Sequence, residues 1–179
     1  FADRNADGTA NGPITGGYGT VNTPALFALL GLELALECGL TNPEIAPAIE
    51  RASNFFAFPT DKGAIPYGDH EPFFQQHENN GKCGTSALAF MFQTNRVEEA
   101  KFFAKMCTAS ATEREHGRTG VFFNYVWAPL GAAAGGPDMA AKLFGRLSWV
   151  YDLSRCWDGR FQYDCLNGEG HHSGSTWYN

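Results

Sequence analysis

The strongest constraint on the fold is a unit that occurs three times along the chain. Each unit has an almost wholly apolar helix-forming segment, then an amphipathic one, then a loop rich in glycine, aromatic and charged residues. The apolar segments span residues 23–37, 84–94 and 119–128, and the amphipathic segments span residues 43–58, 96–107 and 137–153. Repetition on this scale is typical of stacked or closed arrays of helical hairpins. The sequence therefore predicts an all-α fold whose polar loops gather at one end.

The two kinds of segment differ in how much of their surface is apolar. Between residues 24 and 38 only Glu33 and Glu37 are charged, so a helix here is expected to be buried on most sides. Each amphipathic segment instead has one apolar face: Ile45, Ile49, Ala52 and Phe56; Val97, Ala100, Phe103 and Cys107; Leu143, Leu147, Val150 and Tyr151. This alternation predicts an inner and an outer layer. Pro129 is expected to end or kink the third apolar helix.

Composition narrows the classes of partner. The chain has 179 residues, of which 44% are hydrophobic and 18% charged, enough for one buried core or part of a larger one. Its net charge of −6, without a basic run, argues against nucleic acid and anionic membrane surfaces as partners. The longest apolar stretch is too short to cross a bilayer. We therefore expect neither a nucleic-acid nor a membrane partner.

The five cysteines give a limited prediction. Cys38, Cys83 and Cys107 lie in or beside the predicted helices, where a buried free thiol is expected. Cys156 and Cys165 flank one polar loop and are a candidate pair. An odd number of cysteines cannot pair completely within the chain.

Several turns resemble those of a known superfamily. GGYG (residues 16–19), GAIPYGD (63–69) and DGRFQ (158–162) look like the turns before inner helices in the α/α toroids of terpenoid cyclases, protein prenyltransferase β subunits and several polysaccharide-degrading enzymes. HENNGK (77–82), EREHGRTGVFFNYVW (113–127) and WVYDLSRCWDGRF (149–161) resemble more closely a bacterial family of unassigned function with that fold. The resemblance covers most of the chain and implies an α/α toroid.

A complete toroid needs more hairpins than this chain supplies. We therefore expect residues 1–179 to form part of one toroid domain that is truncated at both ends, with the remainder of the parent chain as a partner. Residues 1–22 are expected to be a glycine-rich loop leading into the first helix. The alternative is an open α-solenoid. Solenoid repeats usually join by short turns, whereas residues 59–84 form a long loop, which is uncommon unless it is functional.

Two activities of the superfamily are disfavoured. The zinc site of prenyltransferases resembles Asp-x-Cys in the turn before an inner helix, but here that turn reads Asp158-Gly159-Arg160, with arginine where the thiolate should be. Asp164, Cys165 and His171 do not match a strong zinc pattern. Cyclases need a DxDD or DDxxD cluster, and the sequence contains neither.

Carbohydrate chemistry agrees better with the loops, which hold all five histidines of the chain. Polar groups converging on one pocket are the usual mark of a site. The candidate catalytic residues are His77, Glu78, Asn80, Glu115, His116, Tyr125 and Asp158. The candidate substrate-binding residues are Lys82, Arg118, Trp157 and His171. Trp127 and Trp149 are expected to pack in the core instead.

Two enzyme classes use these residue types. Toroid polysaccharide lyases resemble a scheme in which asparagine neutralises a uronate, histidine or tyrosine removes the C5 proton, and tyrosine or arginine assists the leaving group. A glycoside hydrolase needs two carboxylates, roughly 5–5.5 Å apart for retention or 6.5–9.5 Å for inversion. The function predicted is therefore a carbohydrate-active enzyme, a lyase or a hydrolase, that takes a polysaccharide or oligosaccharide. The alternative is a non-catalytic binding or scaffold module.

The segment DRNADG (residues 3–8) opens like a calcium loop, with oxygen-bearing side chains at alternate positions followed by glycine. Its candidate ligands are Asp3, Asn5 and Asp7. The twelfth position is Ile14, where an acid would complete the ligand set. Calcium is therefore a candidate cofactor, and the alternative is a surface loop rich in glycine, asparagine and aspartate.

Overall fold

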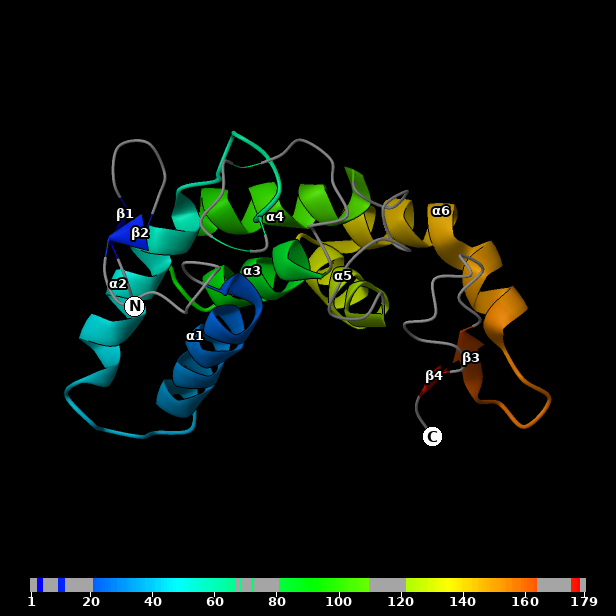
Figure 1. The fold of residues 1–179 in the computed structure, drawn as a ribbon, viewed down its shortest axis with the longest axis horizontal. Helices are drawn as coiled ribbons and strands as arrows, with labels where there is room; N and C mark the ends of the chain where they lie inside the picture. The colour runs from blue at the N-terminus through cyan, green and yellow to red at the C-terminus, as the bar shows by residue number, and fades with distance from the viewer. Residues whose placement is uncertain are drawn as a thin grey trace.

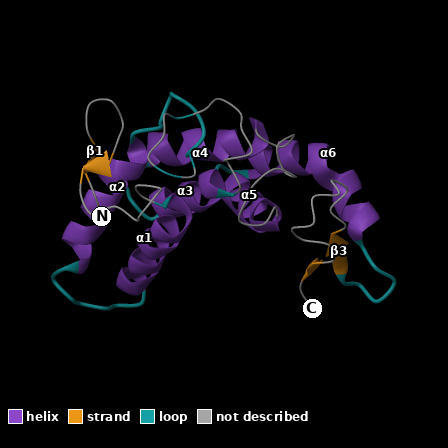
Figure 2. Cartoon of the chain, viewed as in Figure 1, coloured by secondary structure: helices purple, strands orange, loops and turns teal. Residues whose placement is uncertain are grey.

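The computed structural model describes residues 3–4, 10–11, 21–66, 68, 72, 81–109, 122–163 and 175–177. The helices are α1 (Asn22–Glu37), α2 (Ile45–Ala57), α3 (Lys82–Met91), α4 (Val97–Ala109), α5 (Phe122–Ala134) and α6 (Pro137–Ser154). The strands are β1 (Asp3–Arg4), β2 (Ala10–Asn11), β3 (Phe161–Tyr163) and β4 (Ser175–Trp177). Helices dominate the described part of the chain, as Figures 1 and 2 show, so the predicted all-α class is confirmed. The two antiparallel strand pairs were not predicted, because two or three residues are too few for a sequence pattern.

The helices form three consecutive hairpins arranged in two layers. In the first layer, α3 lies between α1 and α5 and packs against both. The second layer holds α2, α4 and α6, of which α4 packs against α6. In Figure 1, α4 and the first part of α6 lie along the upper side of the view, above α3 and α5, and α2 lies beside α1 on the left. This alternation is the one that the apolar and amphipathic segments predict.

The core lies between the layers. Phe90 of α3 stacks on Phe103 of α4 with ring centroids 5.8 Å apart, and both side chains are wholly buried. Burying one such ring stabilises the fold by about 1.5–3 kcal/mol. The predicted apolar faces of α2 and α6 are buried or partly buried as expected, from Ile45 to Phe56 and from Leu143 to Tyr151.

Two expectations about burial are wrong. Val97 is 47% exposed, because it is the first residue of α4 and lies beyond the neighbouring helices. The first layer is also less enclosed than an apolar sequence implies, since Leu34 of α1 and Leu130 of α5 are 45% and 47% exposed. Only α3, with neighbours on both sides, is buried along most of its length.

Glycine permits a close contact between the backbones of α3 and α5. A Cβ atom at Gly84 would overlap the backbone carbonyl of Trp127, and one at Gly131 would overlap the backbone of Gly84. Gly131 also faces the sulfur of Cys107 in α4. The two helices therefore meet backbone to backbone, which only a residue without a side chain allows.

Helix α5 continues through Pro129 to Ala134, so of the two expected outcomes this proline does not end the helix. Proline has no N–H to give to the carbonyl four residues earlier, which belongs to Tyr125. The hydroxyl of Tyr151 in α6 donates a hydrogen bond to that carbonyl at 3.3 Å. The neighbouring helix thus replaces the bond that Pro129 removes, and burial raises the pKa of Tyr151 to about 12.

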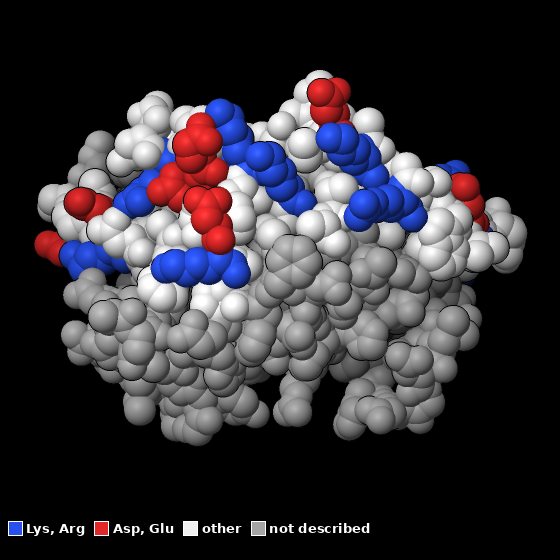
Figure 3. All heavy atoms as spheres, turned by 90° about the horizontal axis from the view of Figure 1, so that it is seen from above, with Lys and Arg blue, Asp and Glu red and all other residues white. Residues whose placement is uncertain are grey.

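Charged side chains cover the second layer. Figure 3 shows acidic and basic groups interspersed on the face seen from above. In α4, Lys101 and Glu98 form an exposed ion pair at 2.9 Å, and Arg96 pairs with Glu99 at 3.0 Å. The exposed pair of Lys101 and Glu98 adds little to stability, because water screens the two charges. The charged faces of the amphipathic segments therefore face solvent, as predicted.

The cysteines differ in their surroundings. Cys83 and Cys107 are buried beside one another, as predicted. Burial raises the pKa of Cys83 to about 11 and the pKa of Cys107 well above its ordinary value. Cys38 is exposed, contrary to expectation, because it lies in the turn after α1 and not within the helix. Cys156 is partly buried, and its candidate partner Cys165 lies outside the described residues.

Candidate functional site

The starts of the first-layer helices carry an unusual number of buried polar side chains. These are Asn22 and Thr23 in α1, Lys82, Thr85 and Ser86 in α3, and Asn124 in α5, each at most 8% exposed. Asn22 donates hydrogen bonds to the carbonyls of Pro66 and Gly68, at 2.9 and 2.7 Å. The start of α1 is thereby tied to the segment that leads toward α3.

Some of these polar atoms have no partner in the described part of the chain. They are Oδ1 of Asn22, Oγ1 of Thr23 and Oγ of Ser86. Most buried polar atoms in native proteins are hydrogen-bonded, so each exception needs an explanation. Three oxygen atoms at this end of the first layer therefore retain capacity for further hydrogen bonds.

Lys82 is the most unusual residue of this set. It is the first residue of α3 and is 1% exposed, although lysine is seldom fully buried. The preceding Gly81 has a φ of 78°, which glycine adopts without strain, and its carbonyl accepts hydrogen bonds from the amide and hydroxyl of Thr85. This turn directs the chain into the helix, with Lys82 as its first residue. A helix N-terminus and a lysine together favour an anionic group.

An aromatic pair joins α1 and α5, the two helices that flank α3 in the first layer. Phe27 of α1 and Trp127 of α5 have ring centroids 5.1 Å apart, and both are partly buried. Trp127 packs against the core as predicted. Trp149 does not, because it is 51% exposed on the outer side of α6.

The other described candidates lie near the end of α6. Tyr125 packs edge to face on Tyr151, with centroids 6.0 Å apart, so its ring faces α6. Asp158 forms an ion pair with Arg160 at 2.6 Å. Burial acts to raise the pKa of Asp158, but hydrogen bonds and the charge of Arg160 outweigh it and lower that pKa. Trp157 is 98% exposed.

The remaining predicted residues lie outside the described part of the chain. They are His77, Glu78, Asn80, Glu115, His116, Arg118, His171, Asn5 and Asp7. The loops containing the first six lead directly into α3 and α5, which both pack antiparallel to α4 and so run in the same direction. Asp3 lies in β1, opposite Asn11 of β2. Among the described residues, no three acidic, histidine or cysteine side chains lie close enough to hold a metal ion.

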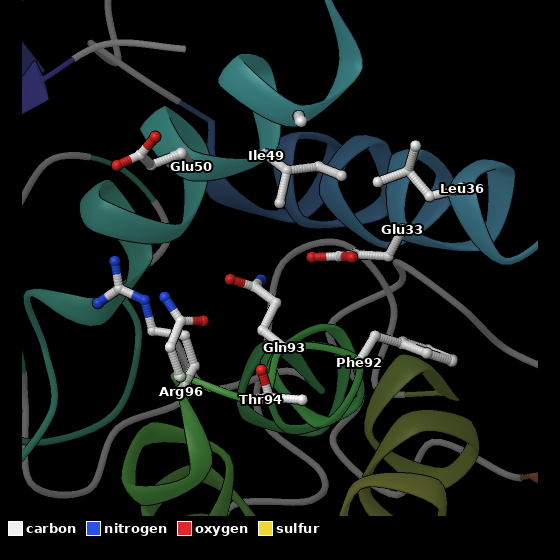
Figure 4. Close-up of a pocket in the computed structure, with 10 residues that line it drawn as sticks. Glu33, Leu36, Ile49, Glu50, Phe92, Gln93, Thr94 and Arg96 are labelled. Atoms are coloured by element: carbon white, nitrogen blue, oxygen red, sulfur yellow. The ribbon is translucent and has the colours of Figure 1, made fainter. Parts of the chain in front are cut away.

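A second polar cluster, which the sequence analysis did not propose, lies at the opposite end of the first layer. A cleft of about 450 Å³ opens between the ends of α1 and α3, the first half of α2 and the turn before α4. Figure 4 shows Glu33 and Gln93 pointing toward one another across it, with Leu36 and Ile49 on one side and Arg96 on the other. Glu33 is 5% exposed, and burial raises its pKa, with Glu37 adding to the rise and a hydrogen bond from Gln93 opposing it.

The fold and these clusters define the class of the protein: helical hairpins in two layers, with polar groups buried at the start of one layer. Residues 2–179 match the family model described as Domain of unknown function (DUF6288), and the chain belongs to that family. Neither a curated protein nor a solved structure matches the chain. No described helix combines the length and apolar character needed to cross a membrane.

Proposed function

We propose that this domain is part of an α/α toroid and that it binds an acidic carbohydrate at the starts of α1, α3 and α5, as a carbohydrate-active enzyme. The observation that carries the proposal is the buried polar set around Lys82. A scaffold has no need to bury a lysine at the N-terminus of a helix, where the partial positive charge of the helix opposes it. A carboxylate of a uronic acid would be attracted both by Lys82 and by the N-terminus of α3.

The other groups at this end suit the rest of a sugar ring. Sugar hydroxyls donate the hydrogen bonds that Asn22, Thr23 and Ser86 can still accept. The Phe27–Trp127 pair offers aromatic surface for the apolar face of a ring. The toroid itself is supported by the two alternating layers and by exposed apolar side chains on α6, Phe144 and Leu153, which suit packing against a further hairpin.

Of the two enzyme classes, elimination agrees better with a buried cation. A lyase must neutralise the uronate before the C5 proton can be removed, and Lys82 supplies a positive charge for that step. His77, Asn80, His116 and Arg118 remain the predicted groups for proton transfer and departure of the leaving group. Hydrolysis by Glu78, Glu115 and Asp158 is the second candidate, although the ion pair of Asp158 with Arg160 disfavours its use as a general acid.

The test is a panel of acidic and neutral glycans incubated with the protein in its full-length form. Absorbance of unsaturated products reports elimination, and new reducing ends without that absorbance report hydrolysis. Lys82→Met should abolish retention on acidic glycan columns, whereas Lys101→Met, an exposed lysine of α4, should not change it. Absence of product and of retention on every glycan would contradict the proposal and favour a scaffold.

A further inference from the structure

The cleft at the opposite end of the first layer contains a carboxyl group with an unused oxygen. Glu33 lines the cleft and is 5% exposed, and its Oε1 atom has no hydrogen-bond donor among the described residues. A buried acceptor without a donor has lost its hydrogen bonds to water without gaining replacements, which is unfavourable. The carboxyl group is therefore placed in the cleft at a cost that a ligand with N–H donors would remove.

The surrounding side chains hold this arrangement in place. Gln93 donates from its amide to the hydroxyl of Ser53 at 2.7 Å, and Ser53 is wholly buried. Arg96 is bound on the far side by Glu99, at 3.0 Å, and by Asn54. Arg96 forms its ion pair with Glu99, and no ion pair joins it to Glu33.

The charge around the cleft favours a cation. The last turns of α1 and α3 contain no basic residue, and their carbonyl ends carry partial negative charge. Glu37 adds a negative charge beside Glu33, and Glu50 lines the cleft from α2. The start of α2 contributes partial positive charge, which Glu44 at its N-cap and Glu50 offset.

The remaining walls are apolar. Leu36, Ile49 and Phe92 line the cleft beside the carboxyl group, and Phe92 is only partly buried. They offer a surface for hydrocarbon but no donor for Glu33. The combination of one unsatisfied carboxyl group, negative surroundings and a short apolar wall is the pattern that recognises an alkylated cation.

We propose that this cleft binds an organic cation, a primary ammonium or guanidinium group on a short alkyl chain, with the cation on Oε1 of Glu33 and the chain on Leu36, Ile49 and Phe92. The group has two sources, a free amine or the side chain of lysine or arginine on a peptide. This inference is independent of the carbohydrate proposal, because the cleft and Lys82 lie at opposite ends of the first layer.

The experiment titrates the protein with n-butylammonium, n-butylguanidinium and neutral 1-butanol at constant ionic strength, followed by calorimetry and by chemical shifts of the Gln93 side-chain amide. Saturable binding of the cations, at least about tenfold tighter than that of butanol, is expected because only they complete the Glu33 site. Nα-acetyl-lysine methylamide forms a second arm: binding as tight as butylammonium selects a peptide source, and weaker binding selects a free amine.

Variants decide which group is responsible. Glu33→Gln should weaken cation binding by at least about tenfold, because it removes the charge but keeps the shape. Glu98→Gln, on the exposed face of α4 and away from the cleft, is the matched control and should change affinity by less than about threefold. Circular dichroism and thermal unfolding verify that both variants are folded. Equal affinity for butanol, unchanged binding by Glu33→Gln, or no saturable binding of any cation would overturn the proposal.

Discussion

The α3–α5 contact and the boundary between α1, α2 and the end of α3 represent opposite ways of packing helices. At the first, Gly84 and Gly131 bring two backbones together and leave no space between them. At the second, a cleft of about 450 Å³ separates the elements, and Glu33, Gln93 and Arg96 line it. The difference shows that packing density varies along the same two layers. The following variants test that contrast, from the largest expected effect to the smallest.

Leu30→Asp tests whether the core extends from the tight contact into α1. Leu30 is 8% exposed, so the variant would bury a charge without a partner and should lower the free energy of unfolding by about 3–5 kcal/mol. Denaturant titration measures the loss. Leu34→Asp is the control, because Leu34 is 45% exposed and should cost less than about 1 kcal/mol. Equal losses would show that α1 is not packed as described.

Gly84→Ala tests the tight contact directly. The added Cβ would overlap the carbonyl oxygen of Trp127, which no side-chain rotation relieves, so a loss of about 2–3 kcal/mol is expected. Gly31→Ala in α1 is the matched control, since a Cβ there meets nothing within 4 Å and should stabilise by about 0.5–1 kcal/mol. Thermal unfolding should therefore shift in opposite directions, and a shared direction would contradict the close approach.

Tyr151→Phe tests how α5 accommodates Pro129 in its interior. Removing the hydroxyl leaves the Tyr125 carbonyl without its hydrogen bond and should cost about 1–2 kcal/mol. In a Pro129→Ala background the new N–H supplies that bond, so the same substitution should cost less than about 0.5 kcal/mol. A double-mutant cycle in denaturant measures the coupling. Additive effects would mean that the tyrosine does not compensate for the proline.

Glu33→Gln tests the cleft through the pH dependence of the free energy of unfolding. Because the pKa of Glu33 is raised in the folded state above 4.5, the native protein retains a proton that the unfolded chain has lost. Wild-type stability should therefore fall as pH rises through the pKa of Glu33 in the folded state. The glutamine variant lacks this loss and should be more stable at neutral pH by about 1 kcal/mol. If the stabilities of the wild type and of Glu33→Gln changed by the same amount across pH, the burial cost assigned to Glu33 would be contradicted.

Much of the fold was predictable because helix periodicity is local. The three apolar and three amphipathic segments correspond to α1 to α6, with the layers in the predicted order. Contacts between distant residues were not predictable in the same way. Tyr151 compensates for Pro129 from another helix, and nothing in the sequence around Pro129 shows it.

The candidate site was likewise predictable only where it depends on local sequence. Lys82 was proposed from the sequence as a substrate-binding residue, but its burial at the start of α3 became visible only in three dimensions. The sequence marks Glu33 as one of two charged residues in an apolar helix, but this alone did not predict a site residue. Its significance depends on α2 and on the turn before α4, which together form the rest of the cleft.

Cys38 is exposed, whereas Cys83 and Cys107 are buried. The rates at which these thiols are labelled therefore report how the buried region opens. A maleimide or iodoacetamide attacks only a thiolate that it can reach. Cys38 should be labelled at once, whereas Cys107, buried against Gly131 at the tight contact, should gain mass only when α3, α4 and α5 separate. Intact mass spectrometry over time would thus report the opening of the tight region without a denaturant.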